Sequence, residues 1–283
     1  MKSVLITGGS GAFGEAFARR LLTTGVSRIV IYSRGEFRQA TMARDLAGID
    51  RNDALRFMIG DVRDKDRLRR AMRGVDTVVH AAALKRIEVG NYNPDEMVRT
   101  NVVGTQNVID ACLDAGVKTA VFLSSDKAYQ PVSPYGHSKA LAECMFLAAN
   151  NMRGAGGTVF TATRYGNVWR STGSVAPVWE TILASTDMVP VTDPECTRFF
   201  MRMDEAVDLV LQAISQKPKD VLIPTLPAYR LGDLAEAMGA RMDVRGLPAW
   251  EKMHESMGPG NSSDLARRMT VAELKTALAE ERA

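Results

Sequence analysis

Short apolar runs alternate along the chain with segments whose apolar positions recur every three to four residues. The runs have the length of strands, and the segments between them have the period of helices. Strands are expected at 4–6, 28–32, 55–59, 77–80, 121–123 and 158–163, and helices at 13–22, 36–46, 65–72, 93–116 and from about 134. This alternation is typical of a parallel sheet with helices on both faces. We therefore expect an α/β protein with a doubly wound parallel sheet.

The pattern becomes less regular after Gly166. Most of the prolines in the chain lie beyond this point: Pro177, Pro190, Pro194, Pro218, Pro224, Pro227, Pro248 and Pro259. Proline interrupts both helices and central strands. We expect residues 1–166 to form the regular core, and residues 167–283 to form mainly a smaller irregular lobe, interleaved with the end of the core.

Composition and charge narrow the class of protein. The chain has 283 residues, of which 46% are hydrophobic and 24% charged, and a net charge of +3, which gives no sign of nucleic-acid binding. Its cysteines are Cys112, Cys144 and Cys196, an odd and widely spaced set that favours a reducing compartment over disulfides or a metal site. No apolar run approaches the roughly 18 residues of a membrane span. We expect a soluble cytoplasmic protein.

A glycine-rich stretch, TGGSGAFG, joins the first strand to the first helix. Gly8, Gly11 and Gly14 have the spacing that lets a backbone turn sharply and approach a pyrophosphate at a helix N-terminus. A lone glycine motif is weak evidence, but this one lies inside a strand–helix–strand unit, where such a motif is expected. It predicts a Rossmann dinucleotide site that includes Thr7, Gly8, Ser10, Gly11, Ala12, Phe13 and Gly14.

The end of the second strand bears on the choice of dinucleotide. An acid that binds the ribose hydroxyls of NAD is usual there, whereas this chain has Ser33 and Arg34, with Arg38 one helical turn further on. These residues favour NADP over NAD, although Arg34 as a surface residue would also tolerate NAD. Asp61 and Val62, after the third strand, are placed to meet the adenine. The alternative for Asp61 is a helix cap.

The stretch SSDKAYQPVSPYGHSK, residues 124–139, holds most of the candidate chemistry. Tyr135 and Lys139 are four residues apart and share one face of an expected helix. A nearby ammonium favours the phenolate, so the tyrosine is suited to take a proton from a sugar hydroxyl. Ser124 and Ser125 stand at the end of the fifth strand, where open α/β sheets bind their ligands.

Together with the glycine loop, these features resemble the extended short-chain dehydrogenase/reductase family. The resemblance implies that Tyr135 transfers a proton, and that Lys139 holds the tyrosine and the nicotinamide ribose. The Asp126-Lys127 pair is similar to that of inverting 4,6-dehydratases of UDP-N-acetylglucosamine, in the polysaccharide-biosynthesis group. Matching stretches run from Val4 to about Met257: GDVRD (60–64), HAAALK (80–85), YNP (92–94), TN (100–101), RYGNV (164–168), TRF (197–199) and EKMHE (251–255).

The resemblance implies a reaction in which C4 of the sugar is oxidised, water is lost across C5 and C6, and the hydride returns to C6. Asp126 would be the acid and Lys127 the base, with Ser125 also in the catalytic site. A lysine base must be neutral, so we expect partial burial and Lys139 to lower the pKa of Lys127. The alternative is that Asp126 and Lys127 form an ion pair in a surface loop.

Further site residues follow from the same resemblance. The cofactor set gains Ala81, Ala82, Ala83, Lys85 and Asn101, and the substrate set is Lys85, Lys127, Asn167, Arg198 and Glu255. Arg198 suits a diphosphate because a guanidinium binds oxygens in pairs. The alternatives are a helix-bending role for Asn101, and ordinary turn and surface roles for Asn167 and Arg198.

Two segments depart from the group's pattern, the loop at 169–173 and the segment at 248–255 with its Ala249-Trp250. These departures leave open which nucleotide and which sugar the substrate contains. We predict an NADP-dependent nucleotide-sugar 4,6-dehydratase acting on a UDP-N-acetylhexosamine, with C5 inversion left open, and we expect a homo-oligomer. The alternatives are a nucleotide-sugar epimerase or reductase, which would not need the Asp126-Lys127 pair, and a non-catalytic NADP-binding regulator.

Overall fold

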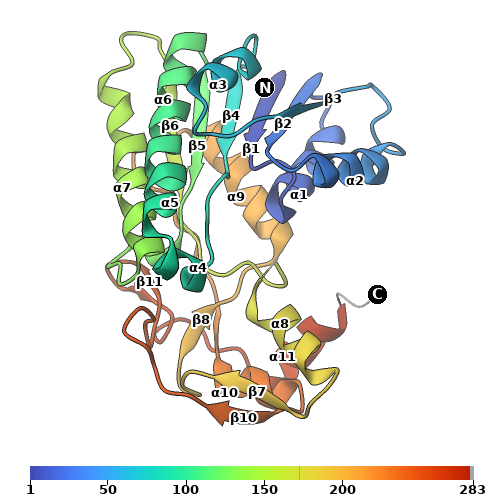
Figure 1. Ribbon diagram of the computed structural model, residues 1–283, viewed down its shortest axis with the longest axis vertical. Coiled ribbons are helices and arrows are strands. Elements are labelled where there is room, and N and C mark those ends of the chain that lie inside the picture. The colour runs from blue at the N-terminus through green and yellow to red at the C-terminus, as the bar shows by residue number, and fades with distance from the viewer. Residues whose placement is uncertain (172, 281–283) are drawn as a thin grey trace.

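A parallel sheet forms the centre of the molecule (Figure 1). The computed structural model describes residues 1–171 and 173–280, so Thr172 of the altered loop lies outside it. The described residues give a six-stranded sheet in the order β3-β2-β1-β4-β5-β6. Its strands are β1 (Ser3–Thr7), β2 (Arg28–Ser33), β3 (Leu55–Ile59), β4 (Thr77–His80), β5 (Thr119–Leu123) and β6 (Val159–Thr163). The doubly wound α/β fold predicted from the sequence is confirmed.

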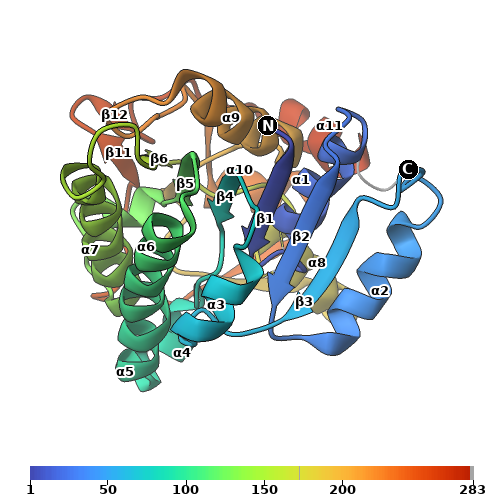
Figure 2. The ribbon, with the colours of Figure 1, turned by 90° about the horizontal axis from the view of Figure 1, so that it is seen from above.

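The two faces of the sheet are buried under different helices (Figure 2). Successive strand residues point to opposite faces, so Leu5 packs in one core and Val4 and Ile6 in the other. One face is covered by α3 (Lys65–Ala71), α6 (Gly104–Ala115) and α7 (Pro134–Ala148), and the other by α1 (Ala12–Leu22), α2 (Glu36–Leu46) and α9 (Met203–Gln216). Burial on both faces explains why the strands read as continuous apolar runs.

Helix α9 comes from the C-terminal part of the chain but packs on the central sheet. Its Ala206, Val207 and Val210 share a core with Phe17 of α1. The chain therefore leaves the sheet after β6 and returns to it before it enters the lobe again. A division of the chain near residue 166 stays a prediction.

The remaining C-terminal elements form a lobe below the carboxyl ends of the strands in Figure 1. Trp169, Trp179, Phe200 and Tyr229 are among the side chains of its own core. Its helices are α8 (Val175–Leu183), α10 (Leu231–Ala237) and α11 (Val271–Glu280). Its strands pair two by two: β7 (Met188–Val191) with β10 (Arg241–Val244), β8 (Thr197–Phe199) with β9 (Ala228–Arg230), and β11 (Ser256–Gly258) with β12 (Asn261–Ser262).

The helix expected over 93–116 is present but is not α-helical throughout. It consists of α5 (Pro94–Met97), a π-helical segment η1 (Val98–Val103) and α6, and α4 (Ile87–Tyr92), which the pattern did not predict, precedes it. Asn93 directly precedes α5, and its side chain does not cap this helix but donates to the Val89 carbonyl at 2.9 Å. No helix in the described residues is long and apolar enough to cross a membrane.

Candidate active site

A cleft of about 1150 Å³ lies between the carboxyl edge of the sheet and the lobe. The sequence-predicted residues that line it are Gly8, Ser10, Gly11, Ala12, Phe13, Gly14, Ser33, Arg34, Arg38, Asp61, Val62, Ala81, Ala82, Ala83, Lys85, Ser125, Lys127, Tyr135, Lys139, Asn167, Arg198 and Glu255. Thr7, Asn101 and Asp126 are not among the lining residues. The structure thus brings most of the predicted set to one cavity, while their individual roles stay predictions.

The glycine loop lies at one end of this cleft. Gly8 has φ +67°, and a Cβ at this position would meet the backbone of Ala82 at 2.9 Å. A larger residue would therefore be strained and would close the gap between the two strand ends. The Ser10 hydroxyl hydrogen-bonds that of Ser33 at 2.8 Å, which fixes the loop to the end of β2. Because the loop backbone borders the open cleft, it can approach the pyrophosphate of a dinucleotide.

Arg34 projects from the end of β2 and keeps 55% of its side chain exposed. Its Nη1 lies 3.8 Å from the Asp61 carboxylate, which Arg63 also contacts at 2.7 Å. The carboxylate of Asp61 is thus occupied by two arginines, and its backbone carbonyl accepts the Tyr32 hydroxyl at 2.8 Å. The free guanidinium edge of Arg34 is accessible to an anion, as a 2′-phosphate would require.

Thr7 and Asn101 act from behind the cleft. Thr7 Oγ1 accepts the Ala82 amide at 3.2 Å, and it also contacts His80, whose pKa falls to about 3 through burial and, to a lesser degree, through Lys139. The Asn101 amide accepts from the Leu84 N–H at 2.8 Å and donates to the Leu84 carbonyl at 2.9 Å. Both side chains therefore hold the segment that lines the cleft after β4.

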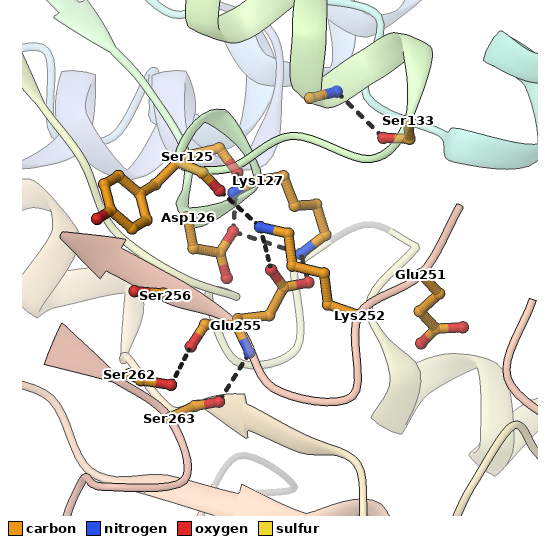
Figure 3. A network of polar contacts seen from close by, with 12 residues as sticks. Ser125, Asp126, Lys127, Ser133, Glu251, Lys252, Glu255, Ser256, Ser262 and Ser263 are labelled. Carbon is orange, nitrogen blue, oxygen red and sulfur yellow. Dashed lines mark hydrogen bonds and ion pairs between the residues drawn. The ribbon is translucent and has the colours of Figure 1, made fainter. Parts of the chain in front are cut away.

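The stretch 124–139, which holds most of the candidate chemistry, follows β5 and begins with a short helix, η2 (Asp126–Ala128) (Figure 3). The Ser125 hydroxyl accepts the Lys127 amide at 3.2 Å and donates to Asp126 Oδ1 at 2.9 Å. Asp126 is only 1% exposed, and its Oδ2 has no hydrogen-bond partner among the described residues. Burial, reinforced by the Glu255 carboxylate, raises the pKa of Asp126 although Lys127 opposes this.

Lys127 is held between two carboxylates (Figure 3). Its Nζ lies 3.3 Å from Asp126 Oδ1, 3.3 Å from Asn167 Oδ1 and 3.1 Å from Glu255 Oε1, which gives one acceptor for each ammonium N–H. Burial disfavours the charged form, but Asp126 and Glu255 outweigh it and raise the pKa of Lys127. The expected lowering of this pKa is therefore wrong, because the charges of Asp126 and Glu255 outweigh the effect of burial.

Glu255 reaches this network from just before β11. It is 2% exposed, its amide donates to the Ser263 hydroxyl at 2.9 Å, and Lys252 lies 3.5 Å from its Oε2. Burial disfavours the anion, but Lys127, Arg198 and Lys252 together lower the pKa of Glu255. Glu255 is thus a fixed negative charge beside Lys127.

Tyr135 and Lys139 lie at the start of α7, which Ser133 caps by accepting the Gly136 amide at 3.1 Å. Burial raises the pKa of Tyr135, although the charge of Lys127 acts in the opposite direction. Burial lowers the pKa of Lys139 to about 7, and its Nζ donates to the Leu123 carbonyl at 2.6 Å. The charge of Lys127 thus favours the phenolate of Tyr135, and the role expected for Lys139 towards the tyrosine stays a prediction.

The side of the cleft away from the sheet is built by the lobe. Arg198 is buried, donates to the carbonyls of Thr197 and Met253 at 2.7 and 3.1 Å, and forms an ion pair with Glu251. The burial of Arg198 excludes the alternative that it is an ordinary surface residue. Tyr229 is also buried, and burial raises its pKa to about 12.

Some residues of the network were not predicted from the sequence. Glu251 and Lys252 belong to the EKMHE stretch, which was recognised as a motif without roles for its first two residues. Tyr229 carries no sequence signal, because a single aromatic in a short strand is ordinary core composition.

The model of the polysaccharide biosynthesis protein family matches residues 4–273 of the chain. The chain belongs to this family. The inverting UDP-N-acetylglucosamine 4,6-dehydratase of Campylobacter jejuni strain 81-176, a curated relative, is 42% identical over 269 residues, which are 93% of this chain and 79% of that protein. A UDP-glucose 4-epimerase of Rickettsia felis is 39% identical over 267 residues, 90% of this chain and 77% of that protein.

Among solved structures, this polysaccharide biosynthesis family member is similar to Pen from Bacillus thuringiensis. The two have a TM-score of 0.89 and 32% identity, over 99% of this chain and 98% of that one. The membership of the extended short-chain dehydrogenase/reductases that the glycine loop and the Tyr135-Lys139 pair indicated is thereby confirmed.

Proposed function

We propose that the protein is a nucleotide-sugar 4,6-dehydratase that acts on a UDP-N-acetylhexosamine with NADP as cofactor. The observation that carries the proposal is the buried Asp126-Lys127 pair, of which Lys127 lines the same cleft as Tyr135 at the carboxyl edge of the sheet. The 42% identity to the Campylobacter dehydratase supports the same reaction. When bound, the nicotinamide would supply the chemistry of taking a hydride from C4 and returning it at C6.

The side chains of the site divide the proton chemistry between them. Tyr135 takes the proton of the C4 hydroxyl, which the charge of Lys127 assists by favouring its phenolate. Lys127 takes the proton at C5, which becomes acidic once C4 is a ketone. Asp126 is the source of the proton for the hydroxyl that leaves C6.

The ammonium of Lys127, whose three N–H groups all have acceptors, cannot act as a base until it loses a proton. Transfer from its Nζ to Asp126 Oδ1, 3.3 Å away, gives a neutral lysine and a protonated carboxyl in one step. Burial favours this form of Asp126, as the raised pKa of its carboxyl indicates. Glu255 stays anionic beside Lys252 and Arg198, and it stabilises the ammonium that forms when Lys127 takes the C5 proton.

The proposed roles are tested with UDP-N-acetylglucosamine and a Lys127→Met variant, which keeps most of the side chain and loses Nζ. We expect wild-type protein to release a 4-keto-6-deoxy sugar nucleotide. The variant should lose about 10²–10⁴-fold in kcat while reduced cofactor still appears in the first turnover. Lys252→Met, which removes the other ammonium beside Glu255, is the matched control and should stay within about tenfold of wild type. Ordinary product release by Lys127→Met would rule out the base assignment.

The NADP assignment rests on Arg34. Removing its guanidinium in Arg34→Ala should weaken NADP binding by about 1.5–3 kcal/mol, the range for a hydrogen bond to a charged group, and leave NAD binding nearly unchanged. Isothermal titration calorimetry with both dinucleotides measures the difference. Arg44→Ala, in the following helix α2 and not among the residues that line the cleft, is the control. An equal loss for NAD and NADP would contradict the assignment.

A nucleotide-sugar 4-epimerase is the second candidate, because the Rickettsia felis relative bears that name at 39% identity. An epimerase would use Tyr135 and would not need a base at C5. The product formed from UDP-N-acetylglucosamine separates the two: a C4 epimer, or a sugar that has lost water.

A further inference from the structure

One of the three tryptophans of the chain is half-exposed on the wall of the cleft. Trp169 and Trp179 are 4% and 3% exposed and pack in the core of the lobe, whereas Trp250 is 45% exposed and lines the cleft. A tryptophan buries a large apolar surface when it has a partner to pack against. The indole of Trp250 is therefore available to pack against a ligand in the cleft.

A turn fixes the backbone that carries Trp250. The Glu251 N–H donates to the Pro248 carbonyl at 3.0 Å, which closes a β-turn over residues 248–251 and places Trp250 at its tip. The Glu251 carboxylate forms the ion pair with buried Arg198. The turn is thus anchored to the lobe before any ligand binds, which reduces the entropy that a contact with the indole would cost.

The charged side chains next to Trp250 already have partners. Glu251 is paired with Arg198, and Lys252 lies 3.5 Å from Glu255 Oε2. Glu251 and Lys252 are only partly exposed, so Trp250 is the one residue of these three that keeps a largely exposed side chain. The contact that this turn offers to a ligand is therefore the face of an indole and not a charge.

Trp250 lies at the end of this segment that is away from Lys127. Glu255 contacts Lys127 at 3.1 Å, whereas Glu251, four residues earlier, contacts Arg198 and lies apart from that cluster (Figure 3). The wall of the cleft thus passes from the indole, by way of Arg198, to Lys127. A nucleotide sugar has its parts in a matching order, with the base at one end, the diphosphate between, and the reacting hexose at the other end.

We propose that Trp250 is a stacking platform for the nucleobase of the nucleotide-sugar substrate. This inference rests on the proposed function, which it deepens by giving the altered segment 248–255 a role in nucleotide binding. Every base has a π-face on which an aromatic side chain can stack. The platform is remote from the reacting hexose, so it strengthens the binding of substrate and transition state equally and acts on KM, not on kcat.

The binding of UDP, which contains the base but no hexose, tests the platform by calorimetry. In protein saturated with NADP, Trp250→Ala should bind UDP about tenfold more weakly than wild type, as expected for the loss of one stacked base. Trp250→Phe keeps an aromatic face and should stay within about threefold of wild type, whereas Trp250→Leu should resemble Trp250→Ala. In turnover, Trp250→Ala should raise KM about tenfold and keep kcat within about twofold of wild type.

Tryptophan fluorescence gives a second readout that needs no turnover. Trp169 and Trp179 are buried, so the emission that responds to a ligand in the cleft should come mainly from Trp250. We expect UDP to quench the emission of wild-type protein and to leave that of Trp250→Phe nearly unchanged.

Two results would overturn the platform. One is UDP binding by Trp250→Ala or Trp250→Leu that equals that of wild type, and the other is quenching that persists in Trp250→Phe. Product analysis of the wild-type reaction keeps this test apart from that of the function. Either result together with a dehydrated product removes only the platform. The predicted binding and quenching together with a C4 epimer as product would leave the platform and remove the dehydratase.

Discussion

The protonation of Lys127 depends on side chains from three separate parts of the chain. Asp126 is its neighbour in sequence, whereas Asn167 and Glu255 reach it from the lobe. The sequence identified Lys127 as a candidate base from the Asp-Lys pair. It could not predict the raised pKa, because Glu255, which raises it together with Asp126, is brought near only by the fold.

The buried ammonium of Lys139 makes a testable contribution to stability. Burial lowers its pKa from 10.5 to about 7, so between these values the unfolded chain binds the additional proton. Stability from this group therefore rises with pH through that window and is flat below it. Urea unfolding of the cofactor-free protein at pH 7, 8 and 9 should show wild type gaining up to about 1.4 kcal/mol per pH unit relative to Lys139→Met. Lys275→Met, at an exposed position, should follow wild type. Parallel curves for wild type and Lys139→Met would contradict the lowered pKa.

Among the secondary-structure elements, the regular part of the fold was predictable and the irregular part was not. The limits of β3 and α2 agree with the sequence pattern, because apolar strand runs and helical periods are local signals. The π-helical segment η1 was read as ordinary helix, since the extra residue in its turn leaves the apolar pattern nearly unchanged. What distinguishes it is Asn101, whose partners Leu84 and Ser138 lie elsewhere in the sequence.

We expect the Asn101 side chain to contribute more to the free energy of unfolding than that of its neighbour Thr100. Asn101→Ala leaves the N–H and C=O of Leu84 without their partners, which we expect to cost about 2–4 kcal/mol in unfolding free energy and to weaken dinucleotide binding. Thr100→Val is the matched control, because the buried Thr100 hydroxyl has no hydrogen-bond partner among the described residues, and it should change stability by less than about 0.5 kcal/mol. Urea unfolding and dinucleotide titration measure both. Equal effects of the two changes would remove the special role of Asn101.

At the scale of the whole molecule, the cleft exists because the lobe is fixed against the helix that carries Tyr135. Glu143 of α7 forms a buried ion pair with Arg164, which also donates to the Met257 carbonyl at 2.6 Å. This contact ties the segment that carries Glu255 to the helix that carries Tyr135 and Lys139. The motif RYGNV marked this region in the sequence, but it gave no indication of the partner at Met257. The homo-oligomer expected from the sequence stays a prediction.

Breaking this ion pair from one side should be costly. Arg164→Met leaves Glu143 charged and buried without its partner, and we expect a loss of about 3–5 kcal/mol in unfolding free energy. The double variant Glu143→Leu with Arg164→Met removes both charges and should be more stable than the single one. Urea unfolding of the three proteins compares them. A single variant as stable as wild type, or a double variant less stable than the single one, would contradict this account.

The most direct test of the dehydratase assignment follows isotopes through one reaction. UDP-N-acetylglucosamine labelled with deuterium at C4 is converted by wild-type protein, and the reaction is repeated with unlabelled substrate in deuterated water. The account predicts a 4-keto-6-deoxy product that carries the C4 deuterium at C6, and one solvent deuterium at C5 in the second reaction. Product that keeps the label at C4, with inverted configuration there and no exchange at C5, would contradict the dehydratase and identify the protein as an epimerase.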